Sequence, residues 1–381
     1  MKPLLMTIAV CALALPVPAR ADSGVREVQF SIPGNDRHIV LVRDLLGETP
    51  SGATVRACLF RWDDEKLASR FVQAARRGVK VRAIAHPFDE RSYRKAHKEL
   101  SKLNEIDDCS FHAFESGPGT KNHNKFVLFS EVEREKDAWR HVVCQTSGNF
   151  TDASKKKYQN TIVFEDPVLY SNYERYWEDI MKHGRADTND LDYYSSCADG
   201  VEWACHGSDA ESVRLYFSPR KQRRGNPSDT IVTALEGVRM TTNRPRPHIR
   251  VAMARWSSER RLIAERLVTL ASSGALVEVV IREPGESPVD PPAVAPLLED
   301  DAPVRVWFAP GSLHSKYMLM DGVHGEEDPS EKKIVWTGSQ NYTGTGLRSN
   351  DEILLEITDD AVHDEYVVDF ERLKSVSKRI K

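Results

Sequence analysis

"VRACLFRWDDEKLASRFVQAARRGVKVRAIAH", residues 55–86, has a near-copy in "IRVAMARWSSERRLIAERLVTLASSGALVEVVIRE", residues 249–283. Each stretch runs from an apolar strand through Arg-Trp into an amphipathic helix, and then through glycine into a second apolar strand. Trp62 and Trp256 lie 194 residues apart, and two further matched pairs, introduced below, lie 191 and 192 residues apart. Such a constant offset indicates that the chain is an internal duplication.

The alternation of strands and helices in both copies predicts an α/β fold. We expect two tandem, similar α/β halves related by a pseudo-twofold axis, with mixed, largely parallel sheets flanked by helices. The repeat places the first half at residues 22–166 and the second at residues 214–381. Residues 167–213, which have no counterpart, are predicted to be a connecting segment.

The first 21 residues have the layout of a secretory signal peptide. Lys2 is followed by an apolar run that is too short to span a bilayer, and small residues at Ala19 and Ala21 predict cleavage after about Ala21. We therefore expect a secreted or periplasmic protein. Export permits disulfides, and the short polar stretch between Cys197 and Cys205 makes them the easiest intramolecular pair.

Composition limits the partners without fixing them. The formal net charge of the 381 residues is -4, so no global basic field points to nucleic acid. Two local basic clusters, residues 155–157 and 220–224, keep nucleic acid open as an alternative. The sequence offers no Cys or His pairs at zinc-ligand spacing and no evident carboxylate cluster, so we expect no metal and no cofactor.

The matched segments "KNHNKFVLFSE", residues 121–131, and "SLHSKYMLMDG", residues 312–322, each place His and Lys two residues apart before an apolar run. Residues at this spacing on a strand point to the same face, so His123 projects with Lys125 and His314 with Lys316. Two cationic pairs at matching places of a duplication indicate a site for an anionic group. The alternative for the first copy is a degenerate, purely structural repeat.

Small polar residues follow each of these strands. "TSGNF" supplies Ser147 and Asn149, and "TGSQN" supplies Ser339 and Asn341. Their hydroxyl and amide groups can donate to phosphate oxygens or support the groups that do. Joined across the pseudo-twofold axis, the two sets predict one cationic pocket suited to a phosphodiester. One imidazole would attack phosphorus and the other would protonate the leaving alkoxide.

"HSKYMLMD" followed by "GSQN" resembles the His-x-Lys-x4-Asp plus Gly-Ser-x-Asn signature of the phospholipase D superfamily. The resemblance extends over nearly the whole mature chain and is strongest to secreted bacterial members. It implies two similar α/β halves with one shared active site, and hydrolysis or transfer at phosphodiesters through a phosphohistidine without metal. On this pattern the catalytic residues are His123, Lys125, His314, Lys316 and Asp321.

The first half departs from that signature, because Ser130 stands where the second half has Asp321. Near the end of the second repeat, Asp351 and Glu352 can each accept from a histidine ring, whereas the first repeat offers no acid there. Because only the second repeat has such carboxylates, this comparison favours His314 as the histidine that is oriented by an acid. The family pattern instead makes His123 the nucleophile, and we predict His123.

Three functions remain from the sequence. The first is cleavage of phospholipid head groups at a membrane surface, by hydrolysis or transfer. The second is a metal-independent nuclease of the same chemistry, and the third is an inactive protein that binds anionic lipid or nucleic acid. Because a duplicated chain can complete its site alone, we expect a monomer.

Overall fold

The computed structural model describes residues 23–88, 91–113, 121–134, 137–186, 204–219, 229–285, 289–326 and 329–381. The predicted signal peptide, the basic cluster at 220–224 and Cys197 lie outside these ranges. Cys205 is disulfide-bonded, while Cys58, Cys109 and Cys144 are free thiols. None of the described helices is long and apolar enough to cross a membrane.

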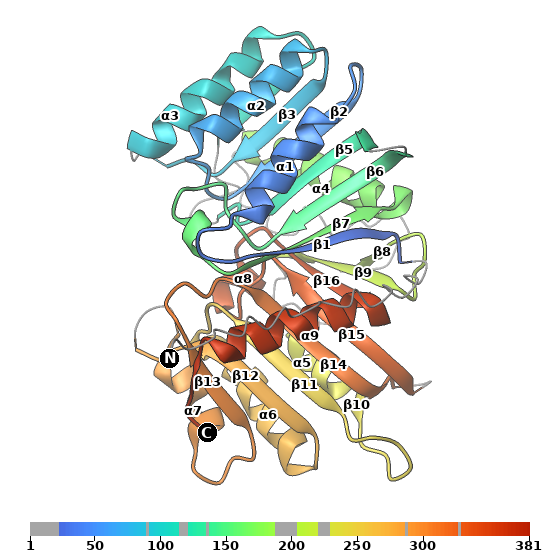
Figure 1. Cartoon of the computed structure of the whole chain (residues 1–381), viewed down its shortest axis with the longest axis vertical. Coiled ribbons are helices and arrows are strands. Elements are labelled where there is room, and N and C mark those ends of the chain that lie inside the picture. Colours follow the sequence, from blue (N-terminus) through green and yellow to red (C-terminus); the bar gives the residue numbers. More distant parts are fainter. Residues whose placement is uncertain are drawn as a thin grey trace, which may run out of the picture.

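The first half forms one sheet with helices on both faces (Figure 1). Its strands are β1 (Val25–Ser31), β2 (Thr54–Leu59), β3 (Lys80–Ala85), β4 (Ser110–Ala113), β5 (Lys125–Arg134), β6 (Asp137–Thr146) and β7 (Gln159–Glu165). Its helices are α1 (Arg37–Gly47), α2 (Glu65–Arg76), α3 (Arg91–Leu100) and α4 (Pro167–Ala186), with short 3-10 turns η1 (Ser101–Glu105) and η2 (Ser154–Lys156). The strand order is β1-β7-β6-β5-β2-β3-β4.

The second half repeats this plan. Its strands are β8 (Ala204–His206), β9 (Val213–Ser218), β10 (Val238–Arg239), β11 (His248–Met253), β12 (Leu276–Arg282), β13 (Arg305–Ala309), β14 (Lys316–His324), β15 (Ser330–Gly338), β16 (Glu352–Thr358) and β17 (Lys378–Arg379). Its helices are α5 (Thr230–Glu236), α6 (Arg261–Ser272), α7 (Pro291–Leu298), α8 (Gly344–Arg348) and α9 (Asp360–Ser375), with the 3-10 turn η3 (Ser258–Arg260). The order is β17-β13-β12-β11-β14-β15-β16-β9-β8, and β10 pairs with β14.

Both sheets are mixed, as predicted, but antiparallel pairs predominate. Within the described strands, parallel pairing is confined to β2–β3–β4 and β11–β12–β13. The strands that carry the site, β5, β6 and β7 in one half and β14, β15 and β16 in the other, form antiparallel meanders. The short connections from β5 to β6 and from β14 to β15 allow antiparallel neighbours, whereas parallel pairs need a long crossover connection. The expectation of largely parallel sheets was therefore wrong for this part of each half.

The duplicated strand-helix-strand stretches form as their patterns indicate. The Asp64 side chain caps α2 by accepting from the Leu67 backbone N–H at 2.9 Å. Leu67, Phe71 and Ala74, spaced along one face of that helix, are buried against the sheet. Trp62 and Trp256 are fully buried and so belong to the cores of their halves.

The two sheets face each other across a shared core. That core includes Tyr173 and Trp177 of α4 together with Tyr317 of β14 and Tyr366 of α9, all buried. Helix α4 packs on its own sheet as α9 does on the second, and Figure 1 shows α4 behind the first-half sheet and α9 in front of the second-half sheet. The residues predicted to form a connection thus begin with a helix that has a counterpart in the repeat.

Candidate active site

The site forms where backbone segments of the two halves are hydrogen-bonded to each other. In one exchange, the His123 N–H donates to the Asp351 carbonyl at 3.0 Å and the Asp351 N–H donates to the Lys121 carbonyl at 3.0 Å. In the other, the His314 N–H donates to the Tyr158 carbonyl at 3.1 Å. Each histidine is therefore fixed next to the first residues of a strand from the opposite half, β16 or β7.

His123 is bound by a carboxylate from the other half. Its Nδ1 lies 2.8 Å from both carboxylate oxygens of Glu352, the first residue of β16. This contact assigns the proton to Nδ1 and leaves Nε2 with its lone pair. Burial, together with the charges of Lys125 and Lys316, lowers the pKa of His123 well below its usual range, so the free ring is neutral.

His314 is bound by an amide at the equivalent place. Its Nδ1 lies 2.8 Å from Oε1 of Gln159, the first residue of β7. The Gln159 amide nitrogen donates to the Ser154 carbonyl at 3.4 Å, which keeps the oxygen directed at the ring. Burial and the neighbouring Lys316 lower the pKa of His314 as well. The two histidines therefore differ in having a carboxylate and a neutral amide behind them.

The two lysines are buried beside their histidines. Lys125 Nζ lies 3.1 Å from His123 Nδ1, and Lys316 Nζ lies 3.2 Å from His314 Nδ1. Burial lowers the pKa of Lys125 to about 7 and also lowers that of Lys316. Burial raises the pKa of Glu352 to about 8, against the opposing charge of Lys125. A cluster of buried groups that titrate near neutrality is characteristic of a functional site.

The serines support this arrangement rather than face a ligand. Ser147 donates to Gln159 Oε1 at 3.2 Å and accepts from the Asn160 N–H at 3.0 Å. Ser339 likewise bonds the Glu352 side chain and accepts from the Ile353 N–H at 3.0 Å. Of the two roles that the sequence left open for these serines, the structure favours support.

Asn149 and Asn341 are held through their backbone. The carbonyl of Asn149 contacts His38 Nε2 at 3.2 Å, and that of Asn341 accepts from Arg260 at 3.0 Å. The side-chain Oδ1 of both asparagines is buried and has no partner among the described residues. An unpartnered amide oxygen can accept from a donor on a ligand, and the Nδ2 group of the same amide can donate to a phosphate oxygen.

Asp321 does not belong to the site. It lies five residues beyond Lys316 on β14 and is exposed, with Lys333 and Arg250 as its charged neighbours. At the matching position the Ser130 hydroxyl accepts from the Thr54 N–H at 2.8 Å, which ties β5 to the start of β2. The structure thus does not bring Asp321 together with the histidines, because the strand carries this carboxylate away from them.

The prediction that the second-half acids support His314 was wrong. Glu352 crosses to His123, and Asp351 pairs through its backbone with the segment before His123. Gln159, which sequence reasoning missed, is the counterpart of Glu352. The signal is present in the sequence, since each residue opens the strand that follows the Gly/Ser/Asn segment, 10 residues after Asn149 for Gln159 and 11 residues after Asn341 for Glu352.

The mouth of the site combines aromatic rings and cations. The Phe60 ring lies 4.6 Å from that of His123, and the Arg61 guanidinium lies over Phe60 and Phe88 at 5.3 and 4.9 Å from their centroids. Beside the other histidine, Arg282 donates from Nε and Nη2 to the Leu313 carbonyl at 2.9 and 2.7 Å. A substrate would therefore meet different surfaces at the two histidines.

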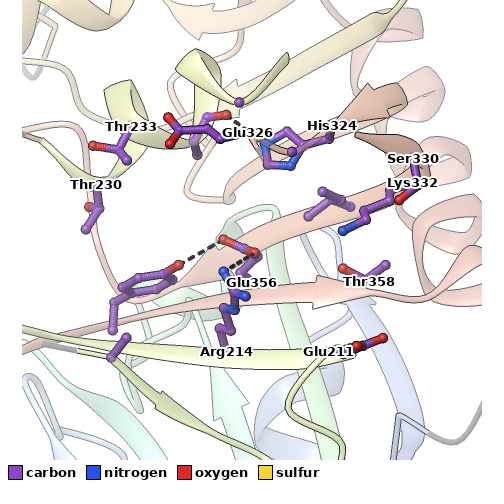
Figure 2. A pocket seen from close by; sticks show the side chains of 16 residues that line it. Glu211, Arg214, Thr230, Thr233, His324, Glu326, Ser330, Lys332, Glu356 and Thr358 are labelled. Atoms are coloured by element: carbon purple, nitrogen blue, oxygen red, sulfur yellow. Dashed lines mark hydrogen bonds and ion pairs between the residues drawn. The ribbon is translucent and has the colours of Figure 1, made fainter. Parts of the chain in front are cut away.

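A separate cavity of about 730 Å³ lies in the second half, lined by residues of α5, β9, β14, β15 and β16 (Figure 2). Two of its polar groups have partners within the protein: Glu356 accepts from Tyr216 and Trp336 at 3.0 Å each, and His324 contacts the Ala234 carbonyl at 2.9 Å. It contains none of the predicted site residues. No group of three His, Cys, Asp or Glu side chains that could hold a metal ion occurs in the described part of the chain.

Comparison with known proteins agrees with this architecture. The family model described as cardiolipin synthase, PLD-like domain, matches residues 46–181 and 240–374, which together make up more than half of the chain. The first match includes most of α4 and so extends past the predicted end of the first half. No curated protein is similar enough to match the chain.

Solved structures share the fold at low sequence identity. Phosphatidylserine synthase from Haemophilus influenzae Rd KW20 is 11% identical with a TM-score of 0.63, over 93% of this chain and 87% of that one. Yeast tyrosyl-DNA phosphodiesterase (the H432N_Glu mutant) is 11% identical with a TM-score of 0.51, over 87% and 88%. Polyphosphate kinase from Porphyromonas gingivalis is 12% identical with a TM-score of 0.56, and this chain spans only 50% of its length.

Proposed function

We propose that this chain, which belongs to the family described as cardiolipin synthase, PLD-like domain, in the phospholipase D superfamily, cleaves phosphodiesters through a phosphohistidine on His123. The observation that supports this assignment is the contact of Glu352 with His123 Nδ1 at 2.8 Å. A carboxylate behind the ring orients the imidazole and stabilises the positive charge that develops when Nε2 bonds to phosphorus.

In the first step, His123 Nε2 forms the bond to phosphorus while the bond from phosphorus to the leaving oxygen breaks. His314, which becomes protonated when the anionic phosphodiester binds beside it, gives its proton to that oxygen. In the second step, water attacks phosphorus, the N–P bond breaks and the proton of water returns to His314. The ammonium groups of Lys125 and Lys316 and the amides of Asn149 and Asn341 stabilise charge on the non-bridging oxygens throughout.

Two substrate classes fit this chemistry. The predicted export and the overall likeness to a phosphatidylserine synthase support phospholipid head groups. The aromatic rings and cations at the mouth support a polynucleotide, because bases stack on aromatic side chains and phosphates pair with cations. We favour the polynucleotide, cleaved by a monomer after export.

A trapping experiment tests the chemistry. A 4-nitrophenyl phosphodiester has a leaving group that needs no protonation, so the His314→Asn variant should form the phosphoenzyme and fail to hydrolyse it. Intact-mass and peptide measurements after an alkaline quench in EDTA should find the adduct on His123. Adduct formation by His123→Asn, or none by His314→Asn, would contradict the assignment. Single-stranded oligonucleotides and phospholipid vesicles, assayed side by side, separate the substrate classes.

A further inference from the structure

Two cations lie beside the backbone that holds His314. Arg282 is held against the Leu313 carbonyl, one residue before the histidine, by the two hydrogen bonds described above. Lys157 directly precedes Tyr158, whose N–H donates to the Ser312 carbonyl at 3.0 Å and whose carbonyl accepts from the His314 N–H. A cation from β12 and a cation from the segment before β7 thus lie next to the backbone around His314.

Lys157 and Arg282 lack acidic partners of the kind that the nearby Lys155 has. Lys155 pairs with Asp64 at 2.7 Å and with Asp152 at 2.9 Å, whereas Lys157 and Arg282 have no carboxylate within ion-pair distance in the described ranges. Lys157 is also partly buried, and burial with the charge of Arg282 lowers its pKa. A pair of like charges gathered beside a catalytic residue without compensation is favourable only when an anion joins them.

The second half does not repeat this arrangement. The backbone bridges match Tyr158 with Asp351, so the position of Lys157 corresponds to Asn350, whose side chain bonds Glu352. The register of β2–β3 and β11–β12 likewise matches Arg282 with His86 beside His123. Lys157 and Arg282 therefore have no cationic counterparts at the matching positions of the other half, although Lys121 and Arg255, which also have no ion pair in the described ranges, act on His123.

The proposed mechanism places the leaving group next to these two cations. In-line attack by His123 drives the leaving oxygen toward His314, so the leaving group occupies the His314 side. We propose that Lys157 and Arg282 form a subsite for a second phosphate carried by the leaving group, and that the substrate is a single-stranded polynucleotide. This inference rests on the proposed function, from which it takes the direction of cleavage.

The surroundings of the site favour a strand over a membrane-bound lipid. The exposed Arg61 lies over the buried Phe60 and the half-buried Phe88 near His123, so its guanidinium is the group there on which a base of the nucleoside that stays on phosphorus can stack. The exposed large apolar side chains of the described residues are Val168, Met240, Leu262, Val368, Val376 and Ile380. None of them belongs to the segments around the two histidines, so the described residues there present no large exposed apolar side chain to a bilayer.

The test compares three small substrates in EDTA: thymidylyl-(3′→5′)-thymidine and the same dinucleotide with an added 5′- or 3′-terminal phosphate. Product analysis identifies the nucleoside that leaves. We expect kcat/KM to be about tenfold higher for the dinucleotide with the phosphate on that nucleoside, as one charge-assisted contact provides. Lys157→Gln should remove this preference, while Lys157→Arg should keep it. Lys156→Gln, at the exposed neighbouring lysine, is the matched control and should leave it unchanged.

The outcomes separate the two proposals. Equal kcat/KM for all three dinucleotides, or a preference that survives Lys157→Gln in a folded variant, would overturn the subsite. A preference seen only with phosphorylated lipid head groups in vesicles would overturn the polynucleotide. Failure to cleave any phosphodiester, with no phosphoenzyme trapped, would instead overturn the proposed function. Thermal unfolding of each variant checks that it is folded.

Discussion

At the scale of single residues, the carboxylate of Glu352 and the amide of Gln159 give the two histidines different chemistry. Glu352→Gln keeps the size of the side chain but removes the negative charge behind His123. We expect the rate of phosphoenzyme formation to fall by about 10²- to 10⁴-fold, as measured by rapid quench with a 4-nitrophenyl substrate. Glu356→Gln, on the same strand but bonded to Tyr216 and Trp336, is the control and should keep the wild-type rate. Equal losses in the two variants would show that the charge at Glu352 has no special role.

The buried Lys125 predicts a pH dependence. Its pKa is lowered to about 7, so the ammonium that would bind the phosphodiester loses its proton as pH rises through that value. Glu352, whose pKa is raised to about 8, must lose its proton over the same range for its carboxylate to support His123. Because kcat/KM reports the free enzyme, it should pass through a maximum between about pH 7 and 8 and fall on the alkaline side. The bound anion favours the ammonium, so the corresponding limb of kcat should lie at higher pH. A kcat/KM that stays constant from pH 6 to 9, measured with a substrate that does not titrate there, would rule this out.

Replacement of Asp321, unlike replacement of Glu352, should have little effect on catalysis. It is exposed and removed from the histidines, so Asp321→Ser, which copies the first half, should change kcat by less than about twofold. The free energy of unfolding should change by no more than about 0.5 kcal/mol, as is usual for surface positions. Steady-state kinetics and denaturant titration of this variant, beside Glu352→Gln, check both values. A large loss of kcat in a fully folded Asp321→Ser would restore the role that the sequence assigned to this residue.

At the scale of secondary-structure elements, the sequence predicts the repeat and the two His-x-Lys strands. Alternation along a strand and a constant offset are local properties, and they place Lys125 with His123 and Lys316 with His314. The support of each histidine is not local. Because the halves exchange segments, Glu352 is near His314 in sequence and near His123 in space, so counting acids within one repeat assigns it to the wrong ring. The antiparallel meanders were missed for a related reason, since buried strands carry the same apolar pattern in either direction.

The strand that delivers Glu352 depends on a close approach at Gly338. This glycine ends β15 with φ +147°, and a Cβ there would lie 2.2 Å from the Ile353 carbonyl oxygen, one residue after Glu352. We expect Gly338→Ala to displace the start of β16, to lower the free energy of unfolding by about 1–3 kcal/mol and to reduce kcat. Gly47→Ala, where a Cβ would meet nothing within 4 Å, is the control and should retain the wild-type free energy of unfolding and the wild-type kcat. Wild-type kcat in Gly338→Ala would mean that β16 tolerates the shift without moving Glu352.

At the scale of the whole molecule, neither half contains a complete site or a complete core. His123 requires Glu352 from the second half, and His314 requires Gln159 from the first. The apolar core between the sheets also takes side chains from both halves, so separating them would expose it to water. The duplication therefore produces one cooperative unit rather than two independent domains, and a single mutation in the shared core should be felt by both halves.

Tyr366 of α9 tests that cooperativity. Its ring packs edge-on against Phe30 of the first half and Tyr317 of the second, each 5.0 Å away between centroids, and its hydroxyl accepts from Asn160 Nδ2 at 3.3 Å. Tyr366→Ala should lower the free energy of unfolding by about 3–5 kcal/mol, and Tyr366→Phe, which loses only the hydroxyl, by about 1–2 kcal/mol. Calorimetry should show one transition that moves as a whole to lower temperature in both variants. Two transitions, of which only one moves in Tyr366→Ala, would mean that the halves unfold independently and that the exchanged segments do not couple them.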